Sequence, residues 1–310
     1  MWFKNLQIYL LNAPFPMTED VLDAALAQKA FSPCGKEQLA SVGWVPALPG
    51  SGLFAHTSNG CVLMCLRKEE KMLPASVVKR MSEEKIHEAE RDKGRRLKRA
   101  EKSEIIYRVK LSLIPRAFTR VTDLSGYVDL INQRIVINTG SRKQAEEFAG
   151  KLRDVVGPLS ARLPALQQAT DTTMTEWLKN QESPDNFTVL DECVLKEPGT
   201  DGAEVRCKRV EVFGYEVQQH LDAGKRVVAL ALQWSDRVRF VLDRELVIRR
   251  LKFDVAVEEE LSSVEASNEL DLLDAEFSLM TVEIERCVSD LFAAMGGVIP
   301  YEDEGDAEAA

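Results

Sequence analysis

Hydrophobic and polar positions divide the first part of the chain into strand-like and helix-like segments. The pattern predicts a strand within 2–10, a helix over 18–29 with Thr18 as its N-cap, and a strand over 60–67. The chain therefore starts as a mixture of the two element types.

The period changes at Leu73-Pro74. Residues 75–91 carry a narrow apolar stripe among many charges, Gly94 interrupts the pattern, and a second helical stretch runs over 95–114 until Pro115 ends it. This pattern predicts a helical hairpin over 75–114. Its far end has little apolar surface to bury, so we expect it to project from the body of the protein.

Strands and helices continue to alternate after Pro115, around a proline-bracketed segment at 158–169 that suggests a domain boundary near 165. The expected strands are 117–122, 126–131, 134–138, 204–212, 226–234, 237–243, 246–253 and 277–283. The expected helices are 142–155, 171–180, 214–222, 256–275 and 284–295. We therefore expect an α+β fold with mixed sheets and a disordered acidic tail at 301–310.

Composition narrows the class of protein. The chain has 310 residues, of which 45% are hydrophobic and 29% charged, which is typical of a globular protein. The longest uncharged run, 38–66, is broken by glycine and proline, so we expect no membrane span. The first twelve residues lack a secretory cleavage site, and we expect the protein in the cytoplasm.

The reactive side chains suggest no enzyme. Six cysteines lie without a C-x-x-C pair, three histidines are widely separated, and no phosphate-binding loop is present. We expect no catalytic residue, no metal and no cofactor. An enzyme whose site is assembled from distant residues stays open as an alternative.

Charge is strongly sorted along the chain, although the net charge is -10. Residues 67–120 hold 17 basic and 9 acidic side chains, whereas residues 254–310 hold 1 basic and 17 acidic ones. Because local charge decides electrostatic binding, the basic stretch is the candidate for an anionic partner.

The strongest candidate is the segment 90–102, here called the basic run, which holds seven basic residues and three acidic ones. Helical spacing would put Arg95, Arg99 and Lys102 on one face, and acids are too few to neutralise the run. The cations of the run that we expect to meet a phosphate backbone together are Lys93, Arg95, Arg96, Lys98, Arg99 and Lys102. A second basic group, Arg206, Lys208 and Arg209, falls on a predicted strand. The alternative is that these charges form only a solvated face.

Short motifs along nearly the whole chain resemble the bacterial recombination-associated RdgC family. They are WFKNL at 2–6, F-x-P-C-G at 31–35, GWVP at 43–46, RKEEK-x-LP at 67–74, LIPRAF at 113–118, LDE at 190–192, RCK at 206–208, AGK at 223–225, RLKF at 250–253 and LMT at 279–281.

The resemblance implies a non-enzymatic protein that encircles duplex DNA as a ring-shaped homodimer, without sequence preference, and restrains RecA-driven strand exchange and fork repair. It implies a curved subunit and association with the nucleoid. Its regions would be a central α+β part at 1–74 and 115–165, a helical tip at 75–114 and a base at 166–300.

The same resemblance suggests roles for residues outside the basic run. It places Arg116, Lys208 and Arg209 at DNA and Phe118 at the contact between subunits. Periodicity alone puts Phe118 in the core about as readily as anywhere else. An alternative function is a protein-interaction scaffold whose basic helical hairpin, 75–114, binds an acidic partner.

Overall fold

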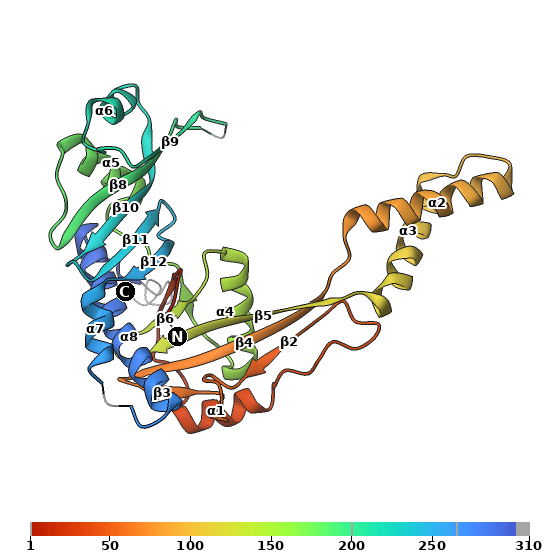
Figure 1. Ribbon diagram of the computed structural model, residues 1–310, viewed down its shortest axis with the longest axis horizontal. Helices are drawn as coiled ribbons and strands as arrows, with labels where there is room; N and C mark the ends of the chain where they lie inside the picture. Colours follow the sequence, from red (N-terminus) through yellow and green to blue (C-terminus); the bar gives the residue numbers. More distant parts are fainter. Residues whose placement is uncertain (1, 200, 265, 302–310) are drawn as a thin grey trace, which may run out of the picture. The chain divides into compact units, whose positions relative to one another are not determined.

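The computed structural model describes residues 2–199, 201–264 and 266–301 (Figure 1). The expected acidic tail, apart from Tyr301, lies outside the described residues. The described chain has a mixed α+β fold with two antiparallel sheets. It divides into a larger compact unit, 1–25 with 46–64 and 125–310, and a smaller unit, 26–45 with 65–124.

The first sheet has seven strands in the order β2-β4-β5-β6-β1-β7, with β3 paired to β4. Its strands are β1 (Gln7–Leu11), β2 (Ala40–Val45), β3 (His56–Ser58), β4 (Cys61–Lys71), β5 (Thr119–Asp129), β6 (Arg134–Ile137) and β7 (Ala161–Arg162).

The strands predicted at 117–122 and 126–131 form the single strand β5, so the predicted gap at 123–125 is wrong. A Cβ at Gly126 would lie 2.8 Å from the Phe148 ring of the covering helix. The glycine therefore allows a close approach between strand and helix.

The second sheet has five strands in the order β12-β11-β10-β8-β9. Its strands are β8 (Phe187–Lys196), β9 (Glu204–Lys208), β10 (Arg226–Trp234), β11 (Val238–Asp243) and β12 (Ile248–Phe253). Strand β8 was not among the predicted elements. The strand predicted over 204–212 ends at Lys208, because Arg209 turns to a φ of 56°.

The helices follow the predicted pattern until the C-terminal region. They are α1 (Glu19–Ala27), α2 (Ala75–Lys93), α3 (Arg99–Leu113), α4 (Arg142–Val156), α5 (Thr170–Asn180), α6 (Tyr215–Asp222), α7 (Val255–Ser262) and α8 (Glu269–Ala294), with a 3-10 turn η1 (Ile114–Arg116). No helix in the described part of the chain is long and apolar enough to cross a membrane.

The predicted strand 277–283 is wrong, because these residues lie inside helix α8. Phe277, Met280, Ile284 and Leu291 are all buried and recur at helical spacing, so they form the inner face of one long helix. The helix predicted over 256–275 divides into α7 and α8. Asn268 begins the second helix, since its side chain accepts from the Asp271 N–H.

Helix α8 links the two sheets of the larger unit through one hydrophobic core. Phe277 stacks edge-on against Tyr127 of β5 at 5.8 Å between ring centroids. Further along the helix, Asp290 accepts from the Trp234 indole of β10 at 2.8 Å. Both sheets therefore pack against the same helix.

The smaller unit is built on strand β2, the outer part of β4 and the two helices α2 and α3. Trp44 of β2 is buried, and its backbone bonds to both Lys29 and Phe31. Arg67 makes two hydrogen bonds to Asp123, at 2.7 and 2.6 Å, which tie β4 to β5.

Candidate nucleic-acid interface

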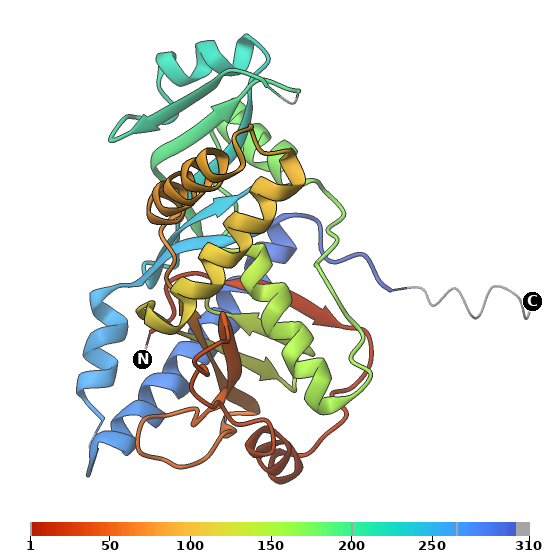
Figure 2. The same cartoon turned by 90° about the vertical axis from the view of Figure 1, so that its right-hand side faces the viewer.

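The residues predicted as a hairpin form helices α2 and α3, which lie side by side (Figure 2). Helix α2 starts directly after Pro74 and ends at Gly94, whose φ of 60° is left-handed and whose N–H bonds to the Arg91 carbonyl. Helix α3 runs into η1 at Ile114-Pro115. The two prolines thus set the outer limits of the hairpin, and Gly94 ends its first helix, as the sequence indicated.

The basic run is not one continuous helix. Residues 94–98 form a loop, and α3 begins at Arg99. Arg95 is therefore not helical, and the prediction that Arg95, Arg99 and Lys102 share a helix face is wrong. The physical cause is Glu101, whose carboxylate accepts from the Lys98 backbone N–H at 2.9 Å and so caps α3.

Glu101 also collects the cations nearest to the loop. Its carboxylate accepts from Lys93 Nζ at 2.8 Å and from both terminal nitrogens of Arg95 at 2.9 Å. These donors hold the pKa of Glu101 well below its usual range, with Arg95 the largest cause. The carboxylate thus joins the end of α2, the loop and the start of α3.

Glu90 makes a second connection across the hairpin. It accepts from the backbone N–H of Leu97 at 2.9 Å and pairs with Lys102 at 3.1 Å, and these contacts, the Leu97 N–H first, lower the pKa of Glu90. The Leu97 side chain is buried. The loop is therefore anchored by one apolar side chain and two carboxylates.

Four cations of the basic run keep their charge available. Arg91, Arg96, Lys98 and Arg99 are exposed, and none has an acidic side chain within 4.0 Å among the described residues. The expectation that acids are too few to neutralise the basic run holds for these four residues. It does not hold for Lys93, Arg95 and Lys102, which are ion-paired.

Phe118 lies in the same unit, just beyond the hairpin and next to the exposed Arg116. Its carbonyl accepts from the Met72 N–H at 2.8 Å, so its backbone continues the sheet. Its side chain is 82% exposed. The alternative that Phe118 belongs to the core of its own chain is therefore wrong.

The second basic group lies in the larger unit and is partly paired. On β9, Arg206 bonds to Glu204 at 2.7 Å and Lys208 pairs with Glu192 at 3.5 Å. Arg209 follows the strand, is exposed, and has no acidic partner among the described residues. Arg206 and Lys208 lie on the strand as predicted, and the prediction that Arg209 also falls on it is wrong.

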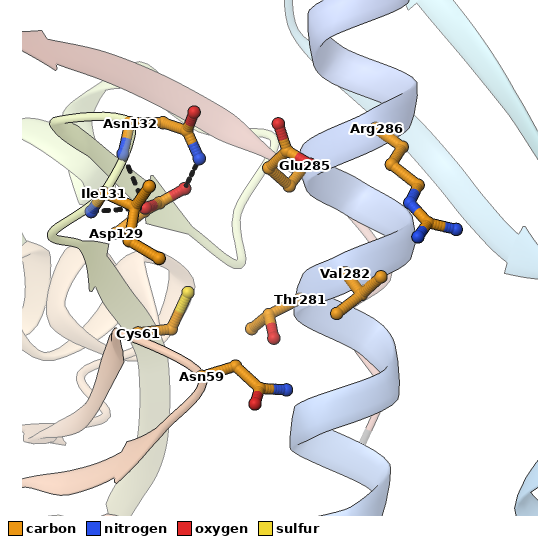
Figure 3. Close-up of a pocket in the computed structure, with 9 residues that line it drawn as sticks. All are labelled: Asn59, Cys61, Asp129, Ile131, Asn132, Thr281, Val282, Glu285 and Arg286. Carbon is orange, nitrogen blue, oxygen red and sulfur yellow. Dashed lines mark hydrogen bonds between the residues drawn. The ribbon is translucent and has the colours of Figure 1, made fainter.

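A cavity of about 370 Å³ lies in the larger unit between helix α8 and the ends of β4 and β5 (Figure 3). Its thiol, Cys61, is buried, which raises its pKa to about 12, with the Asp129 charge adding to the shift. The Asp129 carboxylate itself caps a turn, accepting from Ile131, from the Asn132 backbone and from the Asn132 amide. The Asp129 carboxylate therefore has a structural role in this turn.

Metal-ligating side chains do not gather within the described ranges: no group of three or more His, Cys, Asp or Glu there could hold a metal ion. One pair that the sequence did not indicate is His56 with Asp274, at 2.8 Å. It joins β3 to α8 inside the larger unit.

The sequence did not reveal the Glu101 cluster either, although a signal was present. Glu101 stands three residues after Lys98, which is the spacing of a helix N-cap and its N3 glutamate.

Together, the fold and this surface define an α+β protein with a cationic loop between two helices, a feature typical of proteins that bind polyanions. The family model described as "Putative exonuclease, RdgC" matches residues 1–298. The chain belongs to the RdgC family.

Curated relatives agree over nearly full length. The recombination-associated protein RdgC of Aeromonas hydrophila is 39% identical over 298 residues, covering 96% of this chain and 98% of its own. The proteins of the same name from Colwellia psychrerythraea and Yersinia enterocolitica are 38% and 36% identical, covering 94% and 96% of this chain and 96% and 98% of their own.

Proposed function

We propose that this protein binds duplex DNA through phosphate contacts, without sequence preference, and that the exposed cations at the hairpin loop supply part of the contact. The observation that carries the proposal is the set Arg96, Lys98 and Arg99, which are exposed and have no acidic partner within the described residues. Lysine and arginine side chains of this kind neutralise phosphates and release counterions.

Lys93, Arg95, Lys102, Arg116, Lys208 and Arg209 are proposed as further DNA contacts. The ion-paired members of this group can exchange a carboxylate for a phosphate, at the cost of the existing pair. The unpaired ones have no such cost, so we expect them to contribute more to affinity.

The arrangement in which the protein acts is proposed to be a ring-shaped homodimer that encloses the duplex, with Phe118 at a contact between subunits. The exposed aromatic ring supports this, because a large apolar side chain in water favours burial against a partner. Enclosure slows escape from DNA without base contacts. In recombination the bound ring would restrain RecA-driven strand exchange by occupying the duplex.

The proposed function does not include DNA degradation. A direct test is incubation of end-labelled duplex and single strands with the purified protein and Mg²⁺ or Mn²⁺. We expect the DNA to stay intact, and release of nucleotides in proportion to the protein added would contradict this.

The binding proposal is tested by combining Arg96→Ala, Lys98→Ala and Arg99→Ala and measuring duplex affinity over a range of salt. Each phosphate contact contributes about 0.9 to the slope of log affinity against log salt, so the slope should fall by about 2 to 3. Mixed sequences should bind alike.

A matched control removes three cations that already have acidic partners from the helices on either side of the loop: Lys79→Ala, Lys85→Ala and Arg108→Ala. These pair with Glu83, Glu88 and Glu104. The control should change the slope by less than about 1. An equal loss in both variants would assign binding to overall charge, and binding of polyglutamate in place of DNA would favour the scaffold alternative.

A further inference from the structure

Two of the six cysteines stand directly opposite each other in the second sheet. Cys193 of β8 pairs in register with Cys207 of β9. Cys193 is completely buried, whereas Cys207 is half-buried and packs against the same core. After burial, the neighbouring Cys207 thiol is the next cause of the raised pKa of Cys193.

The register fixes how far apart the two residues are. The Glu197 N–H donates to the Ala203 carbonyl, and hydrogen-bonded pairs recur at every second position, so Cys193 and Cys207 are such a pair. In these pairs the Cα atoms lie about 5.5 Å apart, which is inside the range of about 4.4 to 6.8 Å found in disulfides.

The Cβ atoms need a small movement for a bond to form. Directly opposite Cβ atoms lie about 4.5 to 5.5 Å apart, with hydrogen-bonded pairs at the longer end, and a disulfide requires about 3.5 to 4.5 Å, so the two Cβ atoms must approach by about 1 Å or more. Among the described strands, β9 is an edge strand and pairs only with β8. It can therefore shift by about 1 Å or more without disturbing a further neighbour.

We propose that Cys193 and Cys207 form a redox-sensitive pair that a peroxide oxidises to an intrachain disulfide between β8 and β9. The inference rests on the sheet register and does not depend on the proposed DNA binding.

The reaction proceeds in two balanced steps. Cys207 is the more accessible thiol, and its sulfur attacks hydrogen peroxide, so the O–O bond breaks, a sulfenic acid forms on Cys207 and one water leaves. The Cys193 sulfur then attacks the Cys207 sulfur, and the S–OH bond breaks as the S–S bond forms. The Cys193 proton leaves with the hydroxide as the second water, so two thiols are oxidised and one peroxide is reduced.

Burial explains why Cys193 reacts in the second step and not in the first. It raises the pKa of the Cys193 thiol to about 12, so this thiol is protonated in the resting protein. The product disulfide would tether an edge strand whose exposed face carries Arg206 and Lys208.

The first test treats the full-length protein with hydrogen peroxide, blocks free thiols, and measures the intact mass and the tryptic peptides. We expect two of the six thiols to disappear, the mass before blocking to fall by two hydrogens, and one cross-linked peptide pair containing Cys193 and Cys207. Backbone amides of β9 should then exchange with solvent at least about tenfold more slowly, and a reductant should reverse this.

Variants separate this pair from the other thiols. In Cys193→Ser, Cys207 should be trapped as a sulfenic acid that dimedone labels, and no cross-linked peptide should form. The control Cys61→Ser should still form the disulfide, because it keeps both Cys193 and Cys207. Cys61 and Cys65 lie four residues apart on one strand and cannot bond to each other. Six unreacted thiols, a different cysteine pair, or a disulfide between two chains would each overturn the proposal.

Discussion

Both terminal nitrogens of the Arg95 guanidinium donate to the carboxylate of Glu101, at 2.9 Å each. The same carboxylate accepts from Lys93 and from the Lys98 backbone N–H. One acidic side chain therefore both begins helix α3 and withdraws two cations from the surface that we propose for DNA. Structure and electrostatics at the loop are coupled through this residue.

Glu101→Gln should strengthen DNA binding. The amide keeps an oxygen that can cap Lys98, but it no longer holds Lys93 and Arg95 by charge, so both become available to phosphates. The slope of log affinity against log salt should become steeper by about 1 to 2, measured by fluorescence anisotropy with a mixed-sequence duplex.

Glu104→Gln is the matched control for this change. It also removes one negative charge from α3, but Glu104 pairs with Arg108 within the same helix and holds no loop residue. An equal effect of the two variants would mean that net charge alone governs affinity. Weaker binding by Glu101→Gln would mean that the shape of the loop matters more than its free charge.

Acid should break the contact between Glu101 and the loop only at a pH below the usual pKa of a glutamate. The folded-state pKa of Glu101 is lowered, chiefly by Arg95, from the unperturbed value of 4.5. Such a group contributes stability that is fully present above the unfolded pKa and is lost as the pH falls through the folded pKa. The hydrogen bond to the Lys98 amide should therefore persist at pH 4.5 and disappear only at lower pH.

The measurement for this prediction is the amide chemical shift of Lys98 by NMR over a pH titration from neutral into acid. Its midpoint should lie below 4.5, and Glu101→Gln should lack the transition. A midpoint at or above 4.5 would show that the contacts with Lys93 and Arg95 do not persist in solution.

The hairpin was predictable from sequence because single residues enforce its limits. A helix is limited by Pro74 and Pro115, because proline lacks a backbone N–H, and by Gly94, because its φ is left-handed. None of these effects needs a distant contact. The loop 94–98 was missed because it depends on the Glu101 carboxylate. The pairing of Lys93, Arg95 and Lys102 was missed because it needs both helices in place.

Helix α8 shows a different limit of prediction from sequence. Residues 277–283 include an aromatic and β-branched side chains, which favour a strand when read alone. The helical spacing becomes visible only over a longer window that includes Ile284 and Leu291. Strand β8 was not predicted from the sequence, because its burial depends on pairing with β9 and β10 on either side. Tertiary contacts decide both elements.

Arg237→Ala should destabilise the larger unit strongly. Glu283 of α8 is 1% exposed, and Arg237 bonds to its carboxylate at 2.7 and 2.8 Å. Removing the guanidinium leaves a buried charge without its partner, which costs about 3 to 5 kcal/mol. Urea unfolding followed by circular dichroism measures the loss.

The control for that variant is Glu260→Gln, which removes the other carboxylate that Arg237 contacts. Glu260 is exposed, so water screens its pair with Arg237, and Glu260→Gln should lower the free energy of unfolding much less than Arg237→Ala does. If both variants lose the same small amount, the buried pair with Glu283 does not stabilise the fold as its geometry implies.

Phe118→Ala separates a residue that stabilises its own chain from one that binds another. A buried phenylalanine cut to alanine costs about 3 to 5 kcal/mol, but the Phe118 side chain is 82% exposed and should change the free energy of unfolding by about 0.5 kcal/mol or less. If the ring closes a contact between two subunits, its loss should instead weaken self-association and let DNA dissociate faster. The difference should be largest on circular duplexes, which have no end from which a closed ring can slide.

Sedimentation velocity and competitor-chase experiments on circular and linear DNA measure the two effects, with Ile131→Ala, another strongly exposed apolar residue, as the control. Normal self-association and unchanged release from circles in the folded variant would remove Phe118 from the proposed subunit contact.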